Sequence, residues 1–314
     1  MKVITESSGL KDVVFKNTVL TMGVFDGVHA GHQKVIRCLV EVKEIEGAAV
    51  SILLTFDRHP LNVTHPEMVP PLLTTLEEKV SLLKQMGVDI VVIKKFSRYT
   101  AETDYRTFIS SVLVGRFGMK HLVVGYDFHL GHGREGSQEQ LLDEGRRSGF
   151  GVTIVPPVVL GGRVVSSTKI RRAVTNRRLE RAAKFLTRPY FFDADVIRGR
   201  GFGRELEFPT ANVAVPHGEK LLPPGGVYAV QVEVENRLYG GMMNVGNAPT
   251  FNGDAVGGIE VHMFDFSGDI YGERIRIHCH KFIREEIKFD RPDKLRAQLK
   301  QDREKITLVL EKKR

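Results

Sequence analysis

Two histidines three residues apart, His29 and His32, lie in the ten-residue string GVFDGVHAGH, which begins at Gly23. The string follows a β-rich run over residues 18–22 and precedes a helical stretch over 32–45. Glycines at such a junction let the backbone approach a ligand closely, and the new helix offers unpaired N–H groups to an anion. Both imidazoles can face one phosphate and stabilise the charge that builds on it during an in-line displacement. The alternatives are a helix cap and a zinc pair, and zinc is disfavoured because no third ligand follows at a recognisable spacing.

A second group suited to phosphate is the run SSTKIRR, which begins at Ser166. Hydroxyls at a helix start, followed by cations one turn later, form a cradle for pyrophosphate. The alternative is an N-cap followed by solvated basic residues. Taken alone, the run favours that alternative.

A third group lies in the second half of the chain. Thr210 and Asn212 supply a hydroxyl and an amide at a strand edge, which suits a magnesium–phosphate unit. Glu260, on an alternating strand, can accept the proton of an attacking alcohol. The alternatives are a turn with a hydrogen-bonded asparagine and a solvent-facing carboxylate. His278 and His280 are interpreted as surface or barrel residues rather than metal ligands.

Alternating strands and helices must position the residues of the first half. Strand-like runs cover residues 18–22, 51–56, 90–93, 122–124 and 152–155. Helical patterns cover 32–45, 76–86, 105–117 and 137–147. This alternation predicts βαβ units and a parallel sheet covered on both faces, with ligands beyond the carboxyl ends of the strands.

The pattern changes after residue 190. Short alternating runs separated by Gly- and Pro-rich turns cover 191–196, 227–235, 239–245, 259–266 and 274–282. They predict a small antiparallel barrel or sandwich, and the charged amphipathic tail from 292 to about 311 predicts a terminal helix. We place the boundary near residue 186, which gives domains over 1–186 and 187–314.

Composition excludes several classes of protein. The chain has 314 residues, 42% hydrophobic and 27% charged, which excludes wholesale disorder. No apolar run approaches the roughly 18 residues of a membrane span, and the N-terminus lacks the pattern of a signal peptide. Cys38 and Cys279 form no CxxC motif, so a cytoplasmic enzyme is expected. The net charge of +8 suits nucleic acid or substrates with several phosphates, but the chain has no zinc-finger spacing and no aromatic RNP-type motif.

Nine ordered strings resemble the bacterial bifunctional riboflavin kinase/FAD synthetases. In the first half they include GVFDGVHAGHQKVI, LTFDRHP, VVGYDFHLGHGREG and VVSSTKIRRAV. In the second half they include FPTANV, GVYAV, NVGNAPTF, IEVHMFDFSGDIYGE and FIREEIKF. The resemblance extends from about residue 15 to 305, nearly the whole chain.

The resemblance implies that the first half is an FMN adenylyltransferase with a Rossmann-like parallel sheet. This enzyme would convert ATP and FMN into FAD and pyrophosphate with Mg²⁺. The resemblance implies that His29 and His32 contact the ATP phosphates and that Asp127 lies near the flavin phosphate and metal. The other implied ATP contacts are Gly23, Phe25, Asp26, Ser167, Thr168 and Arg171. Arg58 departs from the family, which usually has proline there.

For the second half the resemblance implies a riboflavin kinase, a small β-barrel that phosphorylates the ribityl 5′-hydroxyl. Thr210 and Asn212 match the metal and nucleotide motif, where Mg²⁺ would be held through the phosphates. Glu260 matches the general base, and Arg284 matches the loop on the flavin side. Phosphoryl transfer in such a site would depend mostly on positioning and charge stabilisation.

Four residues of the second half depart from the family pattern. Glu207 replaces a glycine of the phosphate loop, and it adds a side chain and a negative charge near anions. Ala248 replaces an arginine, and Ala194 and Thr187 replace glycines. These changes motivate an alternative in which the chain is an FAD synthetase only, with a degenerate kinase-like module that acts in flavin binding or assembly.

The main expectation is nevertheless a bifunctional enzyme that acts on ATP, riboflavin and FMN. We expect small-molecule partners, no nucleic acid and no membrane, and an oligomer is compatible with the sequence. The remaining hypothesis is a basic, non-catalytic nucleotide- or RNA-binding protein. Such a protein would show salt-steep binding to polynucleotide without turnover.

Overall fold

The computed structural model describes residues 1–314 except 6–14, 199–207, 217, 247–250, 253–254 and 313–314. Its contacts divide the chain into two compact units. The N-terminal unit comprises Met1–Pro70 and Leu76–Val165, and the C-terminal unit comprises Pro71–Thr75 and Ser166–Arg314. This division assigns the helices between 166 and 186 to the C-terminal unit, and the boundary near 186 stays a prediction.

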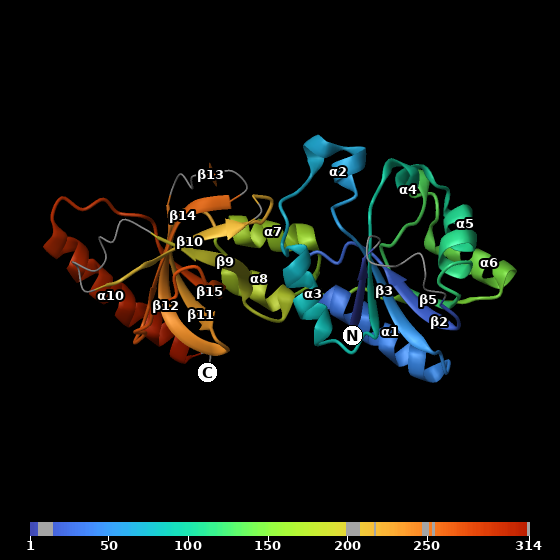
Figure 1. Ribbon diagram of the computed structural model, residues 1–314, viewed down its shortest axis with the longest axis horizontal. Coiled ribbons are helices and arrows are strands. Elements are labelled where there is room, and N and C mark those ends of the chain that lie inside the picture. Colours follow the sequence, from blue (N-terminus) through green and yellow to red (C-terminus); the bar gives the residue numbers. More distant parts are fainter. Residues whose placement is uncertain (6–14, 199–207, 217, 247–250, 253–254, 313–314) are drawn as a thin grey trace. The chain divides into compact units, whose positions relative to one another are not determined.

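A six-stranded parallel sheet forms the centre of the N-terminal unit (Figure 1). In spatial order its strands are β1 (Lys2–Thr5), β4 (Ile90–Lys94), β3 (Val50–Phe56), β2 (Thr18–Met22), β5 (Met119–Gly125) and β6 (Gly151–Val155). Every residue of β2 is buried, and two adjacent residues of this strand, Val19 and Leu20, belong to different core clusters. This is the pattern of a strand covered on both faces, so the predicted α/β fold is confirmed.

The helices of this unit connect the parallel strands. They are α1 (Ala30–Ile45), α2 (Leu61–Thr64), η2 (Pro66–Met68), α3 (Leu76–Lys84), α4 (Arg98–Glu102), α5 (Tyr105–Thr107), η4 (His132–Arg134) and α6 (Gln138–Ser148). The helix expected over 105–117 continues from α5 as the π-helical segment η3 (Phe108–Val114). A short hairpin of β7 (Val159–Leu160) and β8 (Arg163–Val164) follows the sheet. None of the helices in the described part of the chain is long and apolar enough to cross a membrane.

The C-terminal unit is an antiparallel barrel, as predicted. Its strands run β10 (Ala211–Pro216), β9 (Tyr190–Ile197), β15 (Arg274–Arg284), β11 (Gly226–Val234), β12 (Arg237–Val245) and β14 (Ala255–Met263). Pairing of β10 with β14 closes the barrel, and β13 (Phe251–Asn252) adds to β14. Helices α7 (Ser167–Thr175) and α8 (Leu179–Leu186) precede the barrel, and α10 (Pro292–Glu311) follows it.

Helix α10 packs on the barrel through its apolar face. Ile306 and Leu310 join Val227, Met242 and Phe264 in one buried cluster. The expected terminal helix is therefore confirmed, and its apolar positions cover the strands β11 and β12.

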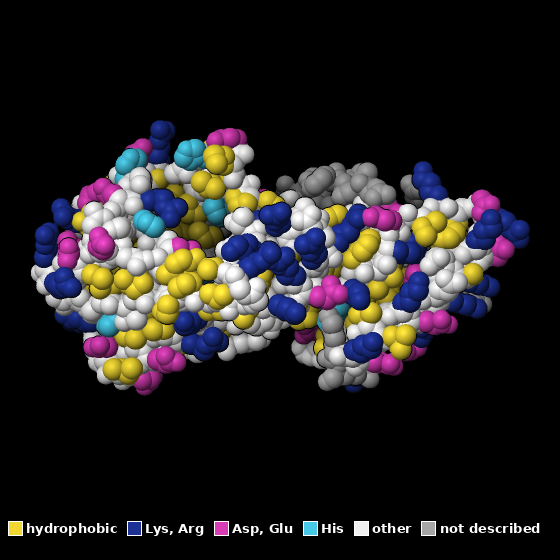
Figure 2. All heavy atoms as spheres, turned by 180° about the vertical axis from the view of Figure 1, so that it is seen from behind, with side chains coloured by type: hydrophobic (Ala, Val, Ile, Leu, Met, Phe, Trp, Pro, Cys, Tyr) yellow, Lys and Arg dark blue, Asp and Glu magenta, His cyan; other side chains and the backbone are white. Residues whose placement is uncertain are grey.

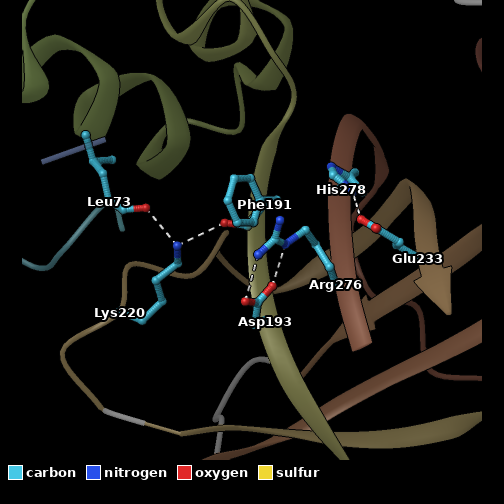
Figure 3. A network of polar contacts seen from close by, with 7 residues as sticks. All are labelled: Leu73, Phe191, Asp193, Lys220, Glu233, Arg276 and His278. Atoms are coloured by element: carbon cyan, nitrogen blue, oxygen red, sulfur yellow. Dashed lines mark hydrogen bonds and ion pairs between the residues drawn. The ribbon is translucent and has the colours of Figure 1, made fainter. Parts of the chain in front are cut away.

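Residues 71–75 belong to the C-terminal unit because Lys220 and its neighbours bind them. The Leu72 amide donates to the Glu219 carbonyl, and the Leu221 amide donates to the Leu72 carbonyl. The ammonium of Lys220, which is buried, donates to the carbonyls of Leu73 at 2.7 Å and Phe191 at 2.9 Å (Figure 3). A buried lysine is stable only when such partners replace its water.

Two polar pairs hold the outer face of β15 to its neighbours (Figure 3). Arg276 makes a two-pronged ion pair with Asp193 of β9, at 2.7 and 3.0 Å. His278 lies 3.4 Å from the carboxylate of Glu233 on β11. These contacts place His278 in the barrel wall, consistent with its interpretation as a barrel residue.

Candidate functional sites

The loop between β2 and α1 has a strained backbone. Phe25, Gly27 and Val28 are left-handed, with φ angles of 50°, 83° and 39°. Phe25 and Val28 are nevertheless buried in the core cluster that packs against α1. A left-handed conformation costs about 1–2 kcal/mol for a residue with a side chain, so the surrounding packing must hold the turn in place. Strain of this kind is concentrated at ligand-binding turns.

His29 and His32 are brought together at the start of α1. Their rings stack with centroids 3.6 Å apart and planes 16° from parallel. His29 is the N-cap of the helix, and its Nδ1 accepts a hydrogen bond from the His32 amide at 3.3 Å. Because Nδ1 is the acceptor, the neutral His29 ring carries its proton on Nε2. A Cβ on Gly31 would lie 3.1 Å from Cε1 of His29, so glycine at this position leaves room for the ring.

The surroundings of His32 keep its imidazole neutral. Burial lowers the pKa of His32 well below its usual value, and His29 and Lys79 lower it further. Its Nδ1 is buried and has no hydrogen-bond partner among the described residues. A polyphosphate beside this ring would favour the protonated form, because a nearby negative charge raises an imidazole pKa. The histidine pair is therefore suited to respond to a bound phosphate.

Lys79 of α3 supports this loop, and the sequence analysis missed it. Its ammonium is buried and donates to the Val24 carbonyl at 2.9 Å and to Thr55 Oγ1 at 3.2 Å. Burial lowers the pKa of Lys79 to about 8, although Asp26 and Asp57 oppose the shift. Its position in the sequence could have indicated burial, since Lys79 lies between Leu76 and Leu83 on the apolar face of α3.

Asp127 lies at the same edge of the sheet as the histidines. Strands β2 and β5 are parallel neighbours, so the loops after their carboxyl ends meet at one edge. The exposed Asp127 follows β5 by two residues, and its carbonyl accepts a hydrogen bond from His129 Nδ1 at 3.0 Å. Gly23 and the buried Asp26 belong to the loop after β2.

The residues Ser167, Thr168 and Arg171 lie in the first turns of α7, which belongs to the C-terminal unit. Ser166 is the N-cap of this helix and accepts from the Lys169 amide at 3.4 Å. Arg171 donates to the Pro71 carbonyl at 2.7 Å. The helix start therefore has the predicted cap, with hydroxyls in its first turn.

Three polar residues form a row across the barrel wall. Asn212 of β10 and Asn244 of β12 are both register partners of Glu260, which lies on the strand between them. Residues directly opposite in antiparallel strands project from the same face. The neighbouring Val213 and Val261 are fully buried, so the row lies on the face away from the barrel core. Asn244, which the sequence analysis did not single out, also donates to Glu286 at 3.2 Å.

His262 connects this row to the start of β10. It lies two residues after Glu260 on β14, hence on the same face, and its Nδ1 donates to the Pro209 carbonyl at 2.8 Å. The ring packs between Phe208 and Phe264 at 5.1 and 5.6 Å. Burial lowers the pKa of His262. This hydrogen bond fixes Pro209, the residue directly before Thr210. His262 is therefore a second supporting residue that the sequence did not reveal.

Arg284 is held by the terminal helix. Its Nε and Nη2 both lie 2.8 Å from Asp302 Oδ2, and Nη1 donates to the Glu285 carbonyl. Asp302 is completely buried and also accepts from Gln298 at 2.9 Å. Arg284 thus fixes the end of β15 against α10.

The departures from the family pattern fall into two groups. Glu207 and Ala248 lie outside the described residues. Ala194 is fully buried in β9, and Thr187 ends α8 in the left-handed conformation with φ of 62°. A glycine at position 187 would adopt this conformation without steric cost.

The donors near Glu260 fit a hard cation held together with phosphates. Asn212 and Glu260 offer oxygen atoms, which Mg²⁺ prefers, and they are too few to complete its coordination without substrate oxygens. Among the described residues, no group of three or more His, Cys, Asp and Glu side chains is arranged to hold a metal ion by itself.

Comparisons with known proteins cover both units. A family model for FAD synthetase matches residues 12–169, and a model for riboflavin kinase matches residues 186–310. The "Bifunctional riboflavin kinase/FMN adenylyltransferase" of Bacillus subtilis is 36% identical over 91% of this chain and 90% of its own length. The protein of the same name from Escherichia coli K12 is 36% identical over 96% of both chains.

A solved structure is similar over nearly the full length. It is titled a macrolide-efflux protein from Streptococcus pneumoniae, has 31% sequence identity and a TM-score of 0.86, and covers 97% of this chain and 98% of its own. The two sites therefore lie in a fold that has been observed in another chain of the same extent.

Proposed function

The chain belongs to the family of bifunctional riboflavin kinase/FMN adenylyltransferases, and we propose that it makes FAD from riboflavin in two ATP-dependent steps. The kinase step transfers the γ-phosphoryl group of ATP to riboflavin and releases ADP. The adenylyl step joins AMP from a second ATP to FMN and releases pyrophosphate. The observation that carries the proposal is that the FAD synthetase model covers the His29–His32 pair and the riboflavin kinase model covers the row around Glu260.

In the adenylyl step, the FMN phosphate attacks the α-phosphorus of ATP and the bond to pyrophosphate breaks. His29 presents its Nε2 proton, and His32 gains a proton more readily once phosphate is near. Hydrogen bonds from the two rings would stabilise negative charge on the α-phosphate and the leaving group. The buried Lys79 holds the Val24 carbonyl and so keeps the loop in place during the displacement.

The remaining adenylyl-site assignments are part of the same proposal. Gly23, Phe25 and Asp26 shape the nucleotide pocket, and Asp127 lies toward the flavin phosphate. The first turn of α7 binds the triphosphate through Ser167, Thr168 and Arg171. Amides at a helix start and nearby hydroxyls favour such an anion.

In the kinase step, Glu260 accepts the proton of the ribityl 5′-hydroxyl while that oxygen attacks the γ-phosphorus. Asn212 and Asn244 are the register partners of Glu260 on the two neighbouring strands, and this strand pairing holds Glu260 in the wall of the barrel. Thr210 and Asn212 would hold Mg²⁺ together with the phosphates. When bound, the cation would neutralise charge on the transferred group. Arg284 shapes the flavin side through its contact with α10.

The alternative, an FAD synthetase with a degenerate kinase module, is not favoured. The riboflavin kinase model spans the whole C-terminal barrel, and the pairing of Asn212 with Glu260 is intact. Glu207 and Ala248, two of the substitutions that motivated this alternative, lie outside the described residues. As ATP and flavin precursors are metabolites of the cell interior, we place the enzyme in the cytoplasm.

Isotope transfer tests the proposal. Protein supplied with riboflavin, Mg²⁺ and γ-³²P-labelled ATP should give labelled FMN and labelled FAD. With α-³²P-labelled ATP, the label should enter FAD only. Label from the γ position in neither flavin would refute the kinase step, and absence of α label from FAD would refute the adenylyl step.

A further inference from the structure

A cavity of about 580 Å³ lies between α8 and β15, away from the row around Glu260. Two strands separate β15 from β14 in either direction around the barrel. The lining of the cavity contains five basic residues, one acidic residue and one aromatic residue: Arg177, Arg178, Arg181, Lys184, Lys281, Glu180 and Phe282. Figure 2 shows Lys and Arg side chains gathered where α8 lies.

Helix α8 directs three of these cations to one side. Its buried residues Leu179, Ala182 and Leu186 face the barrel. Arg178, Arg181 and Lys184 follow one another at three-residue intervals, and none of them has an ion pair with another described residue. Like charges at this spacing destabilise a helix by a few tenths of a kcal/mol per pair. A bound anion would remove that repulsion.

Arg177 is a fixed wall of the cavity. Its guanidinium pairs with Glu285, donates to the Gly225 carbonyl at 2.8 Å and lies 4.8 Å above the Phe282 ring. Its backbone is left-handed, with φ of 57°. The Nε atom is buried and has no hydrogen-bond partner among the described residues. One N–H of a preorganised guanidinium is thus still to be satisfied.

The size and charge of the cavity indicate the class of ligand. Its volume falls in the range of small-molecule sites. Glu180 lies 3.8 Å from Lys281 and offsets one charge, which leaves an excess of cations. Arginine forks bind phosphate oxygens in pairs, whereas a nucleic acid backbone would need cations spread along a track.

We propose that the cavity between α8 and β15 binds a chain of two or three phosphates, free or carried by a nucleotide, at a site separate from both reactions. The proposal does not depend on the activities assigned above. It rests on the concavity, the concentration of unpaired cations along α8 and the preorganised Arg177.

Calorimetric titration with inorganic tripolyphosphate, without Mg²⁺, tests the proposal. The test variant is R178E/R181E/K184E. The control R147E/K300E/K305E changes the net charge equally at exposed positions elsewhere. Wild type and control should each bind one more equivalent of tripolyphosphate than the test variant does. If the test variant still binds this additional equivalent, its affinity should be at least tenfold lower. Turnover at saturating substrates should stay within twofold in all three.

Equal stoichiometry and affinity in the test and control variants would overturn the proposal. If the charge reversal prevents folding, R181Q/K184Q replaces it, and unchanged tripolyphosphate binding by that variant would again overturn it. A non-hydrolysable ATP analogue forms a second arm. Cavity-dependent binding of either probe supports the site, and tighter binding of the analogue identifies a nucleotide as the source. Cavity-dependent binding of a 20-nucleotide RNA without binding of either probe would identify a nucleic-acid surface and contradict the proposal.

Discussion

Asn212 of β10 and Glu260 of β14 are register partners on adjacent antiparallel strands, 48 positions apart in the chain. The closure of the barrel creates this pairing, since β10 and β14 are its first and last strands in spatial order. Asn244 pairs with Glu260 from the other side. The residue that we propose as the base is therefore positioned by the same strand pairing that closes the barrel.

His262 provides a test of how the kinase site is positioned. Replacement by phenylalanine keeps a ring between Phe208 and Phe264 but removes the donor to the Pro209 carbonyl. One lost hydrogen bond corresponds to about 0.5–1.5 kcal/mol, so H262F should raise the KM for ATP or lower kcat of riboflavin phosphorylation by roughly 2- to 10-fold.

Asparagine at position 262 is the matched control, because its amide can donate near the place of Nδ1. H262N should retain more kinase activity than H262F, while both variants keep the FMN adenylyltransferase rate. Equal kinetic constants in H262F and wild type would show that the contact does not position the site.

His32 tests the adenylyl site. H32A removes one of two stacked imidazoles that can donate to phosphate, and loss of a single such donor lowers turnover by roughly 10² or more. FAD formation from FMN should fall by that factor. Riboflavin phosphorylation serves as internal control and should stay within twofold, because Glu260 lies in the other unit. Full FAD formation by H32A would contradict the proposed role of His32.

Lys79 should make the stability of the N-terminal unit depend on pH. Its pKa is about 8 in the folded protein and about 10.4 in an unfolded chain. Between these values the unfolded state binds more protons, so the free energy of unfolding rises with pH, by about 3 kcal/mol in total. Below pH 8 the lysine is charged in both states, so it makes no further contribution to the pH dependence of the free energy of unfolding.

Urea unfolding followed by circular dichroism at pH 7.5 and 9.5 measures this effect. The stability of wild type relative to K79M should increase between the two pH values, since methionine has a similar length and no charge. Parallel changes in the two proteins would contradict a depressed pKa of Lys79.

Thr187 should be a site of removable strain. A threonine in the left-handed conformation costs about 1–2 kcal/mol, and T187G should raise the stability of the C-terminal unit by about 1 kcal/mol. A183G, in the interior of the same helix, should lower it by a similar amount. Urea unfolding followed by near-UV circular dichroism, to which the buried Tyr190 and Tyr228 of this unit contribute, measures the change. Destabilisation by T187G would show that the side chain at position 187 contributes more than its backbone costs.

Local signals predicted most of the fold. The strand over 18–22 and the helix over 292–311 have the predicted bounds, because hydrophobic periodicity and Pro292 at the helix start are encoded locally. Edge strand β1 and strand β10 were not predicted. They are short, and the pairings of β1 with β4 and of β10 with β14 join segments that lie far apart along the chain.

The candidate site residues likewise divide into those with a local sequence signal and those without one. The two histidines were singled out from their own string, since a strand–turn–helix junction is a local feature. Lys79 and His262 were not found, because each makes a contact with the backbone of a residue more than 50 positions away. Such contacts are created by packing and leave no short sequence motif.

The most direct test of the bifunctional assignment is a paired product assay by chromatography. Purified protein receives ATP and Mg²⁺ with either riboflavin or FMN as the flavin. We predict FAD from both substrates, with FMN as an intermediate in the riboflavin reaction. FAD from FMN alone would contradict the assignment and show that the barrel with its Asn212–Glu260 pair does not phosphorylate riboflavin.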